Sequence, residues 1–149
     1  MKIAIGADHA GYEVKEKIKT QLAELNFDVV DLGTNSAESV DYPDYGAKVG
    51  KFVADGAADE GIIVCGSGIG ICIAANKIHG VRAAQAWNAE TATLARQHND
   101  ANVLSIGARV LPSEEIPKII SAWFAAKFEG GRHQNRIDKI SNLENQQNI

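Results

Sequence analysis

Short apolar runs alternate along this chain with longer segments in which apolar residues recur every three or four positions. The short runs predict buried strands, and the periodic segments predict amphipathic helices. The expected strands span 2–6, 28–33, 60–66, 81–86 and 102–107, and the expected helices span 12–26, 70–78, 88–99 and 113–128. A loop within 41–56 leads into a further helix, and a polar tail at 129–149 ends in a short one.

The alternation of strands and helices predicts a mostly parallel sheet with helices on both faces. Asn88 and Ser113 directly precede two of the helices and are their expected N-caps. In such sheets ligands bind beyond the carboxyl ends of the strands. The turns after the first and third strands are therefore the places to search for a site.

Composition narrows the class of protein. The chain has 149 residues, of which 45% are hydrophobic and 23% are charged, which is typical of one globular domain. A net charge of −4 argues against a nucleic-acid surface, and no apolar run approaches the ~18 residues of a membrane span. An early acidic residue argues against a signal peptide, and two cysteines without CxxC or zinc spacing suggest free thiols in a reducing cytoplasm.

Three glycines spaced two apart follow the third strand, in the segment "CGSGIG" at 65–70. The spacing departs from the dinucleotide fingerprint G-x-G-x-x-G, and the glycine-containing turn "GADHAG" lacks the Lys-Ser/Thr of a P-loop. Backbone N–H groups at a helix N-terminus can bind a phosphate or an oxyanion that develops during a reaction. A tight turn that needs glycine for a positive φ explains the same residues. Both interpretations stand at this point.

Cys65 lies where the third strand meets the following helix. The helix dipole and exposed N–H groups favour a thiolate there, which could act as nucleophile or base. A small buried hydrophobe is an equally good interpretation. Cys72 lies inside the helix and is expected only to pack, whereas Asp8 and His9 follow the first strand and are expected at the same sheet edge as Cys65.

Two further segments group polar residues. "RQHND" at 96–100 brings His98 and Asn99 together between a helix and a strand, where a surface or capping role is the simplest interpretation. "EGGRHQNR" at 129–136 places Arg132 and Arg136 four residues apart, on one face if the segment is helical. Paired guanidinium groups suit a phosphate dianion, although a solvated tail explains them too.

Five separated motifs together resemble one known family. "GADHAG", "DYP", "VCGSGIGICIAANK", "RQHNDANVL" and "EGGRHQNR" are similar to motifs of the type B ribose-5-phosphate isomerases, within the wider ribose/galactose phosphate isomerase family. The resemblance covers essentially the whole chain, in the same order. It implies a single domain, residues 1–149, with a Rossmann-like three-layer α/β/α sandwich and a five-stranded parallel sheet that binds no nucleotide. It also implies a homodimer or a dimer of dimers, with interface active sites and the tail 129–149 packed there.

The resemblance implies interconversion of ribose 5-phosphate and ribulose 5-phosphate through an enediolate, without metal or cofactor. Cys65 is expected to be the base that moves a proton between C2 and C1, and His98 is expected to open the furanose ring. Ser67 is the expected hydroxyl donor beside the loop 66–70, which holds the enediolate oxygen. The expected substrate ligands are Gly66, Gly68, Ile69 and Gly70 of that loop, Asp8, Asn99 and Tyr42 around the sugar, and His9, Arg109, Arg132 and Arg136 on the phosphate. Some relatives use a glutamate further along the loop in place of the cysteine, and residues 66–75 contain no acid.

The positions of Cys65 and His98 suggest a shared site. Cys65 ends its strand, whereas His98 precedes its own strand and so belongs to the opposite edge of a parallel sheet. A strand of six residues is ~20 Å long, so we expect His98 to come from a partner chain. Three alternatives remain: an isomerase of allose 6-phosphate, galactose 6-phosphate or a tetrose phosphate; a phosphate- or nucleotide-binding regulatory module with an inert Cys65; and a thiol redox protein, which the missing CxxC spacing disfavours.

Overall fold

The computed structural model describes residues 1–146, and the last residues of the expected tail, 147–149, lie outside the described part of the chain. Strands and helices alternate along most of it, as the apolar pattern predicts. The elements are β1 (Lys2–Ala7), α1 (Tyr12–Glu24), β2 (Asp28–Asp31), α2 (Tyr42–Ala54), β3 (Glu60–Cys65), α3 (Ile69–Asn76), β4 (Ala83–Gln85), α4 (Ala89–Asn99), β5 (Val103–Gly107), α5 (Glu115–Ala125) and α6 (Arg132–Gln146). Within the described residues, no helix is both long enough and apolar enough to cross a membrane.

The five strands form one sheet in the order β2-β1-β3-β5-β4, and every neighbouring pair is parallel. The expected five-stranded parallel sheet is therefore confirmed. β2 lies on one side of β1, whereas β3, β5 and β4 lie on the other, so the order of the strands reverses between β1 and β3. The turns that follow these two strands flank the point where open α/β sheets bind ligands.

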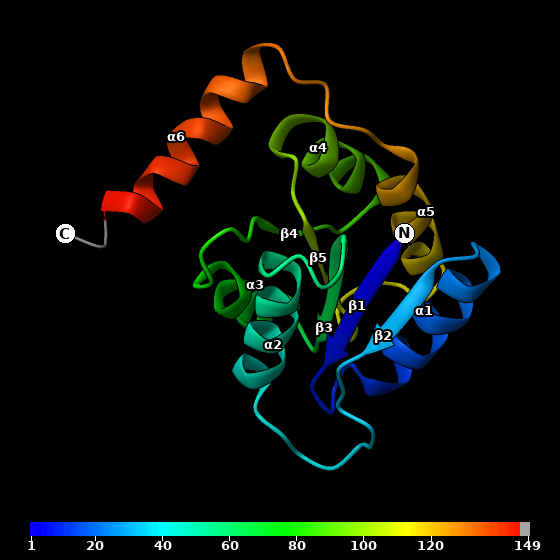
Figure 1. Cartoon of the computed structure of the whole chain (residues 1–149). Coiled ribbons are helices and arrows are strands. Elements are labelled where there is room, and N and C mark those ends of the chain that lie inside the picture. The colour runs from blue at the N-terminus through cyan, green and yellow to red at the C-terminus, as the bar shows by residue number, and fades with distance from the viewer. Residues whose placement is uncertain (147–149) are drawn as a thin grey trace.

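Helices cover both faces of the sheet, which confirms the three-layer sandwich (Figure 1). One face packs against α1, α4 and α5 through a core that includes Leu22, Leu104 and Trp123. The other face packs against α2 and α3 through Val49 and Ile71 among others. All six residues of β3 are buried, because a central strand of a parallel sheet is covered on both sides.

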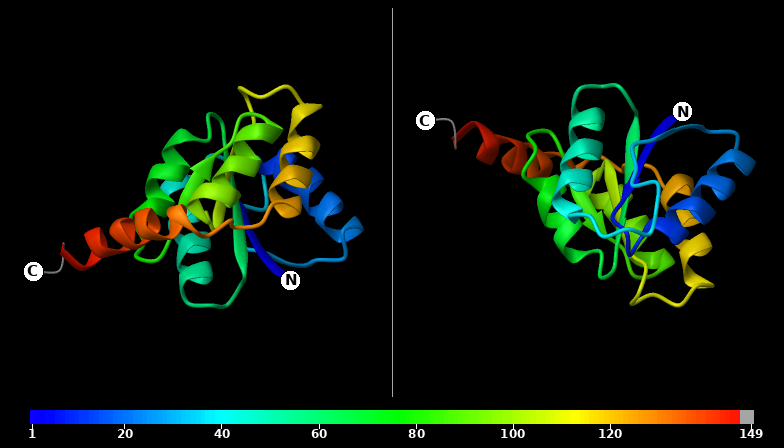
Figure 2. Two further views of the ribbon diagram at one scale, coloured as in Figure 1. Left: turned by 90° about the horizontal axis from the view of Figure 1, so that it is seen from above. Right: turned by 90° about the horizontal axis from the view of Figure 1, so that it is seen from below.

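The last helix, α6, stands apart from the sandwich (Figures 1 and 2). Its 15 residues make it longer than the short helix expected from the sequence. Its first turns bury His133 and Ile137, whereas Ile140 and Leu143 further along are 42% and 55% exposed. The same side of the helix therefore begins against the body of the protein and continues with exposed apolar side chains.

Local hydrogen bonds explain where the element boundaries agree with the sequence and where they differ. Asn88 caps α4 as expected, because its side chain accepts the N–H of Thr91 at 2.8 Å. Ser113 is not a cap: α5 begins at Glu115, whose N–H bonds to the carbonyl of Pro112 in a preceding turn.

β4 is shorter than the expected 81–86. At its start, side-chain amide oxygens accept backbone N–H groups. The oxygen of Asn102 accepts the N–H of residue 82, and the oxygen of Asn76 accepts the N–H of residue 83. The N–H of residue 82 is therefore not free to extend the strand toward residue 81.

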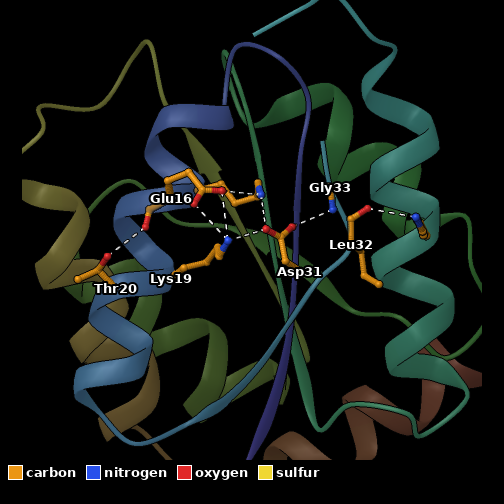
Figure 3. Close-up of polar contacts among 8 residues, drawn as sticks. Glu16, Lys19, Thr20, Asp31, Leu32 and Gly33 are labelled. Atoms are coloured by element: carbon orange, nitrogen blue, oxygen red, sulfur yellow. Dashed lines mark hydrogen bonds and ion pairs between the residues drawn. The ribbon is translucent and has the colours of Figure 1, made fainter. Parts of the chain in front are cut away.

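An ion-pair network around the buried Lys15, which the sequence pattern did not predict, joins α1 to β2 (Figure 3). The side chain of Lys15 is fully buried, and its Nζ lies 2.6 Å from Asp31 Oδ2 and 3.0 Å from Glu16 Oε1. Lys19 binds the same two carboxylates. Asp31 Oδ1 also accepts the N–H of Gly33 at 2.9 Å, which anchors the start of the loop that leads to α2.

Candidate active site

The glycine loop is packed tightly between β5 and the start of α2. Gly68 has a φ of 76°, and a Cβ placed there would lie 2.9 Å from the backbone N of Gly107. A Cβ on Gly70 would lie 2.5 Å from Cζ of Tyr42. Both a left-handed turn and close approach thus require glycine here, which supports the structural interpretation of these residues without deciding the functional one.

Cys65 lies beneath this loop, 4% exposed, against the core formed by α2 and α3. Its Sγ accepts the backbone N–H of Gly68 at 3.1 Å. A packed thiol needs no such donor, whereas a thiolate is stabilised by a backbone N–H at the start of a helix. The contact therefore suits a sulfur that carries negative charge during a reaction.

Side chains from two neighbouring strands hold the loop in this position. Ser105 donates its hydroxyl to the carbonyl of Gly68 at 2.6 Å, and Gln85 donates its amide to the carbonyl of Ser67. Ser67 itself accepts the N–H of Ile69 at 3.1 Å, so its hydroxyl proton is available to a ligand. Sequence reasoning missed Ser105 and Gln85, although a polar residue inside an otherwise apolar strand was a readable signal.

The turn after β1 lies beside the loop, as expected from the sheet. Asp8 is 6% exposed, and its Oδ1 accepts the N–H of Gly11 at 3.0 Å. His9 Nδ1 lies 3.1 Å from the backbone N of Val40, which ties this turn to the end of the segment between β2 and α2. Arg109 borders the loop from the other side, because a Cβ on Gly66 would lie 3.4 Å from its Cδ.

The structure thus brings most of the expected site residues together at the carboxyl edge of the sheet. This group, which we call the Cys65 group, includes residues from the ends of three strands and from the start of α2. Its members are Asp8, His9, Tyr42, Cys65, Gly66, Ser67, Gly68, Ile69, Gly70 and Arg109.

The remaining expected residues form a second group at the opposite edge, which we call the histidine group: His98, Asn99, Arg132 and Arg136. Arg96, in the same helical turn as His98, reaches the carboxylate of Glu60 at 3.4 Å. Glu60 begins β3 and Cys65 ends it, so five steps of about 3.3 Å separate the two groups by about 17 Å along the strand. Within this chain the expected base and the expected ring-opening histidine do not meet.

Two further residues join the histidine group, and sequence reasoning missed both. The ring of His133 stacks on that of His98, with centroids 4.3 Å apart and planes inclined by 15°. Glu129 Oε1 lies 3.5 Å from Nε2 of His98 and 3.7 Å from Nε2 of His133. His133 is buried, and its burial, together with the nearby His98 and Arg132, lowers its pKa. Glu129 precedes α6, so no helical spacing in the sequence signalled this contact.

One cavity lies away from Cys65. It is a cleft of about 510 Å³ between α6 and the body of the protein. Asn99 and Arg82 line it on one side, and Ile140, Leu143 and Glu144 line it on the other. Glu144 also accepts the N–H of Gly80 at 2.9 Å, which fixes the far end of α6. This cleft belongs to the same edge of the sheet as the histidine group.

Cys72 behaves as the sequence predicts. It is half-buried, its thiol lies 3.5 Å from the carbonyl oxygen of Ala83, and burial raises its pKa. A thiol that is harder to ionise makes a poor nucleophile. Cys72 therefore packs, whereas Cys65 has a backbone donor aimed at its sulfur.

Comparison with known proteins gives consistent matches over nearly the full length. The family whose model matches is Ribose/Galactose Isomerase, over residues 3–140. The chain is 47% identical to ribose-5-phosphate isomerase B of Escherichia coli, over 99% of both chains. It superimposes on the structure of Clostridium thermocellum ribose-5-phosphate isomerase B with a TM-score of 0.97 and 47% identity, covering 98% of this chain and 99% of the other. The Mycoplasma genitalium enzyme with bound ribulose-5-phosphate gives a TM-score of 0.93 and 45% identity, covering 97% and 96%.

Proposed function

Because this chain belongs to the ribose/galactose isomerase family, we propose that it interconverts ribose 5-phosphate and ribulose 5-phosphate. The relatives described above carry the name of this activity, and one of them binds ribulose-5-phosphate. The observation in this chain that best supports the chemistry is the N–H of Gly68 directed at Cys65 Sγ. This donor would stabilise negative charge on the sulfur at the sheet edge where ligands bind.

Cys65 acts in this proposal as the base. It removes the weakly acidic proton from C2 of the open-chain aldose and returns a proton to C1, which yields the ketose. The intermediate enediolate carries negative charge on oxygen. The backbone N–H groups of the loop 66–70 that are not already bonded to Cys65 and Ser67 would stabilise that oxygen, with the Ser67 hydroxyl as a further donor, and Ser105 and Gln85 hold the loop in place.

The histidine group supplies the other functions. His98 opens the furanose ring, and Asn99 contacts the sugar. Arg132 and Arg136 bind the phosphate together with His9 and Arg109 of the Cys65 group. Two guanidinium groups one helical turn apart provide several N–H donors to a dianion. Binding of the phosphate, which takes no part in the reaction, holds C1 and C2 near the base.

A second copy of the chain completes the site. The two groups lie about 17 Å apart along β3 within one subunit, so one copy cannot present both to one small sugar. Large apolar side chains are also exposed where a partner would pack. Ile69 and Ile73, one turn apart on α3, are 55% and 57% exposed, and Trp87 is 61% exposed. Together with Ile140 and Leu143 of α6, they form the surface that we assign to the dimer interface.

The first experiment measures conversion of ribose 5-phosphate to ribulose 5-phosphate by the purified protein, with no metal or nucleotide added. Turnover that Cys65→Ala abolishes while the fold persists would support Cys65 as the base, and Cys72→Ala serves as the matched control. Allose 6-phosphate and galactose 6-phosphate run as competing substrates, and a preference for either would move the chain to another branch of the family. Absence of turnover on every sugar phosphate by folded protein would leave a phosphate-binding module with an inert thiol.

The shared site has its own test. Inactive Cys65→Ala and His98→Ala proteins are mixed, unfolded and reassembled, and native mass spectrometry verifies that mixed dimers form. Half of the dimers are then mixed, and one of the two sites in each carries both intact groups. Activity should therefore recover to about a quarter of the wild-type value. No recovery in verified mixed dimers would mean that each site is built from one chain. Pairing of two dimers and the cytoplasmic location stay predictions.

A further inference from the structure

The expected ring-opening histidine belongs to a compact cluster of three side chains. His98 and His133 stack face to face, and one oxygen of Glu129 faces Nε2 of both rings, at 3.5 and 3.7 Å. The backbone of Glu129 is itself tied to α4, because its N–H bonds to the carbonyl of Gln97 at 3.1 Å. Residues from the end of α4, from the linker between α5 and α6, and from the start of α6 thus meet at one point.

A metal ion fits these three ligands poorly, although their ligand atoms lie within 4.8 Å of one another. An imidazole binds a metal through a lone pair that lies in the plane of its ring, at about 2.0–2.1 Å. Two rings inclined by only 15°, with centroids 4.3 Å apart, cannot both direct such a lone pair at one ion. The stack instead indicates that the rings act on each other.

The surroundings of His133 make this ring harder to protonate. Burial, the neighbouring His98, and the cations Arg132 and Arg136 all lower the pKa of His133, and only Glu129 opposes them. Two stacked imidazolium ions would repel each other, so a neutral His133 keeps the stack free of that repulsion. His98 is also the more exposed ring, with 38% of its side chain accessible.

We propose that Glu129 and His133 are positioning residues that orient His98 for ring opening, an inference that rests on the function proposed for His98. The carboxylate of Glu129 favours a proton on Nε2 of His98, so that Nδ1 faces the sugar. The flat face of His133 prevents the His98 ring from turning about its χ2 bond. In the same way, the carboxylate of a Ser-His-Asp triad sets the tautomer and orientation of the catalytic histidine.

The step that this cluster serves is balanced in protons. In ring opening, the anomeric hydroxyl loses its proton, the C1–O4 bond breaks, a C1=O1 double bond forms, and O4 gains a proton. One imidazole nitrogen at the ring can hand a proton from one oxygen to the other, without any oxidant or reductant. Its efficiency depends on the direction of that nitrogen, which Glu129 and His133 control.

The test separates ring opening from isomerisation. Ribose 5-phosphate is a closed furanose, whereas ribulose 5-phosphate cannot close a furanose ring because its O5 carries the phosphate. Forward turnover therefore requires ring opening, but exchange of the C1 hydrogen of ribulose 5-phosphate with D₂O, followed by NMR, requires only the base. Glu129→Gln and His133→Phe should lower forward kcat about tenfold and leave the exchange rate within about twofold of wild type. His98→Ala gives the fall in forward kcat expected when ring opening by the histidine is lost. Asp138→Asn, which removes an exposed acid of α6, is the matched control.

The pH dependence of the forward rate is a second measurement, which a merely structural role of Glu129 would leave unchanged. Glu129→Gln removes the negative charge beside His98 and should shift the histidine-dependent limb of the forward rate by about half a pH unit toward lower pH. Glu129→Asp should restore part of the wild-type profile. Forward rates of Glu129→Gln and His133→Phe equal to that of Asp138→Asn would overturn the proposal. Loss of forward rate and exchange together would also overturn it, since the cluster would then support the whole site. Lack of both activities in the wild type would instead refute the proposed function.

Discussion

The variant Gly70→Ala offers the sharpest test of the predicted position of Tyr42 beside the substrate. Gly70 is the second residue of α3, and a Cβ there would lie 2.5 Å from Cζ and 2.9 Å from Oη of Tyr42. Non-bonded carbon atoms sit about 3.5–4.0 Å apart. The variant Gly70→Ala must therefore displace the Tyr42 ring by at least about 1 Å.

The displacement should cost activity rather than stability. Tyr42 is 41% exposed, so its ring can turn toward solvent without disturbing the core. Alanine also favours a helix over glycine by up to about 1 kcal/mol. We expect the free energy of unfolding to change by less than about 1 kcal/mol. The value of kcat/KM for ribose 5-phosphate should fall by about 10- to 100-fold, because a displacement of about 1 Å misaligns the substrate.

Urea denaturation and steady-state kinetics of four proteins test this reasoning: wild type, Gly70→Ala, Tyr42→Ala and the double variant. Without the Tyr42 ring, the added methyl group has nothing to displace, so Gly70→Ala should cause little further loss in the Tyr42→Ala background. Full activity of the single variant Gly70→Ala would refute the prediction that the Tyr42 ring lies against the sugar. An equal loss in both backgrounds would mean that the methyl group itself obstructs the substrate.

Three other changes test the structure through stability, each measured by urea denaturation. Asn88→Ala removes the side-chain acceptor at the start of α4 and should cost about 1 kcal/mol; no change would argue against the cap. Gly11→Ala places a methyl group 2.5 Å from a main-chain carbonyl oxygen of β3 that cannot move aside. The free energy of unfolding should therefore fall by about 3 kcal/mol, and a decrease under about 1 kcal/mol would contradict that packing. Burial raises the pKa of Asp31, but hydrogen bonds from Lys15 and Lys19 hold it below its ordinary value. Its stabilisation is therefore present above the ordinary carboxyl pKa of about 3.9 and is lost as pH falls through the lowered folded value. Asp31→Asn should be less stable by about 2 kcal/mol at pH 7 and approach the wild type near about pH 2, whereas a constant difference would contradict the linkage.

The pattern of apolar residues was enough to predict the layers of the fold. Buried runs and helical stripes are local signals, and their alternation leaves a parallel sheet with helices on both faces as the expected arrangement. The same logic placed Asp8 and Cys65 at one edge, because both residues follow parallel strands. Boundaries were less predictable: side-chain amides shorten β4, and a turn replaces the cap expected at Ser113.

The contents of the site were only partly readable. Residue types and motif spacing selected Cys65, His98 and the arginines, and their assigned roles stay predictions. The supporting contacts were not readable, because Ser105 and the carbonyl of Gly68 are 37 residues apart in sequence and meet only through the pairing of strands β3 and β5. Fully buried Lys15 was unexpected for the same reason, since its partner Asp31 belongs to another element.

By itself, then, the sequence determined which segments become strands and helices, which edge each motif occupies, and which family the chain resembles. These properties follow from periodicity and from the direction of parallel strands, which are local in the chain. Only the tertiary structure decided that α6 stands off the sandwich, that His133 covers His98, and that a backbone N–H meets the sulfur of Cys65. Those contacts depend on how separate elements pack against one another, and packing is determined by the whole chain at once.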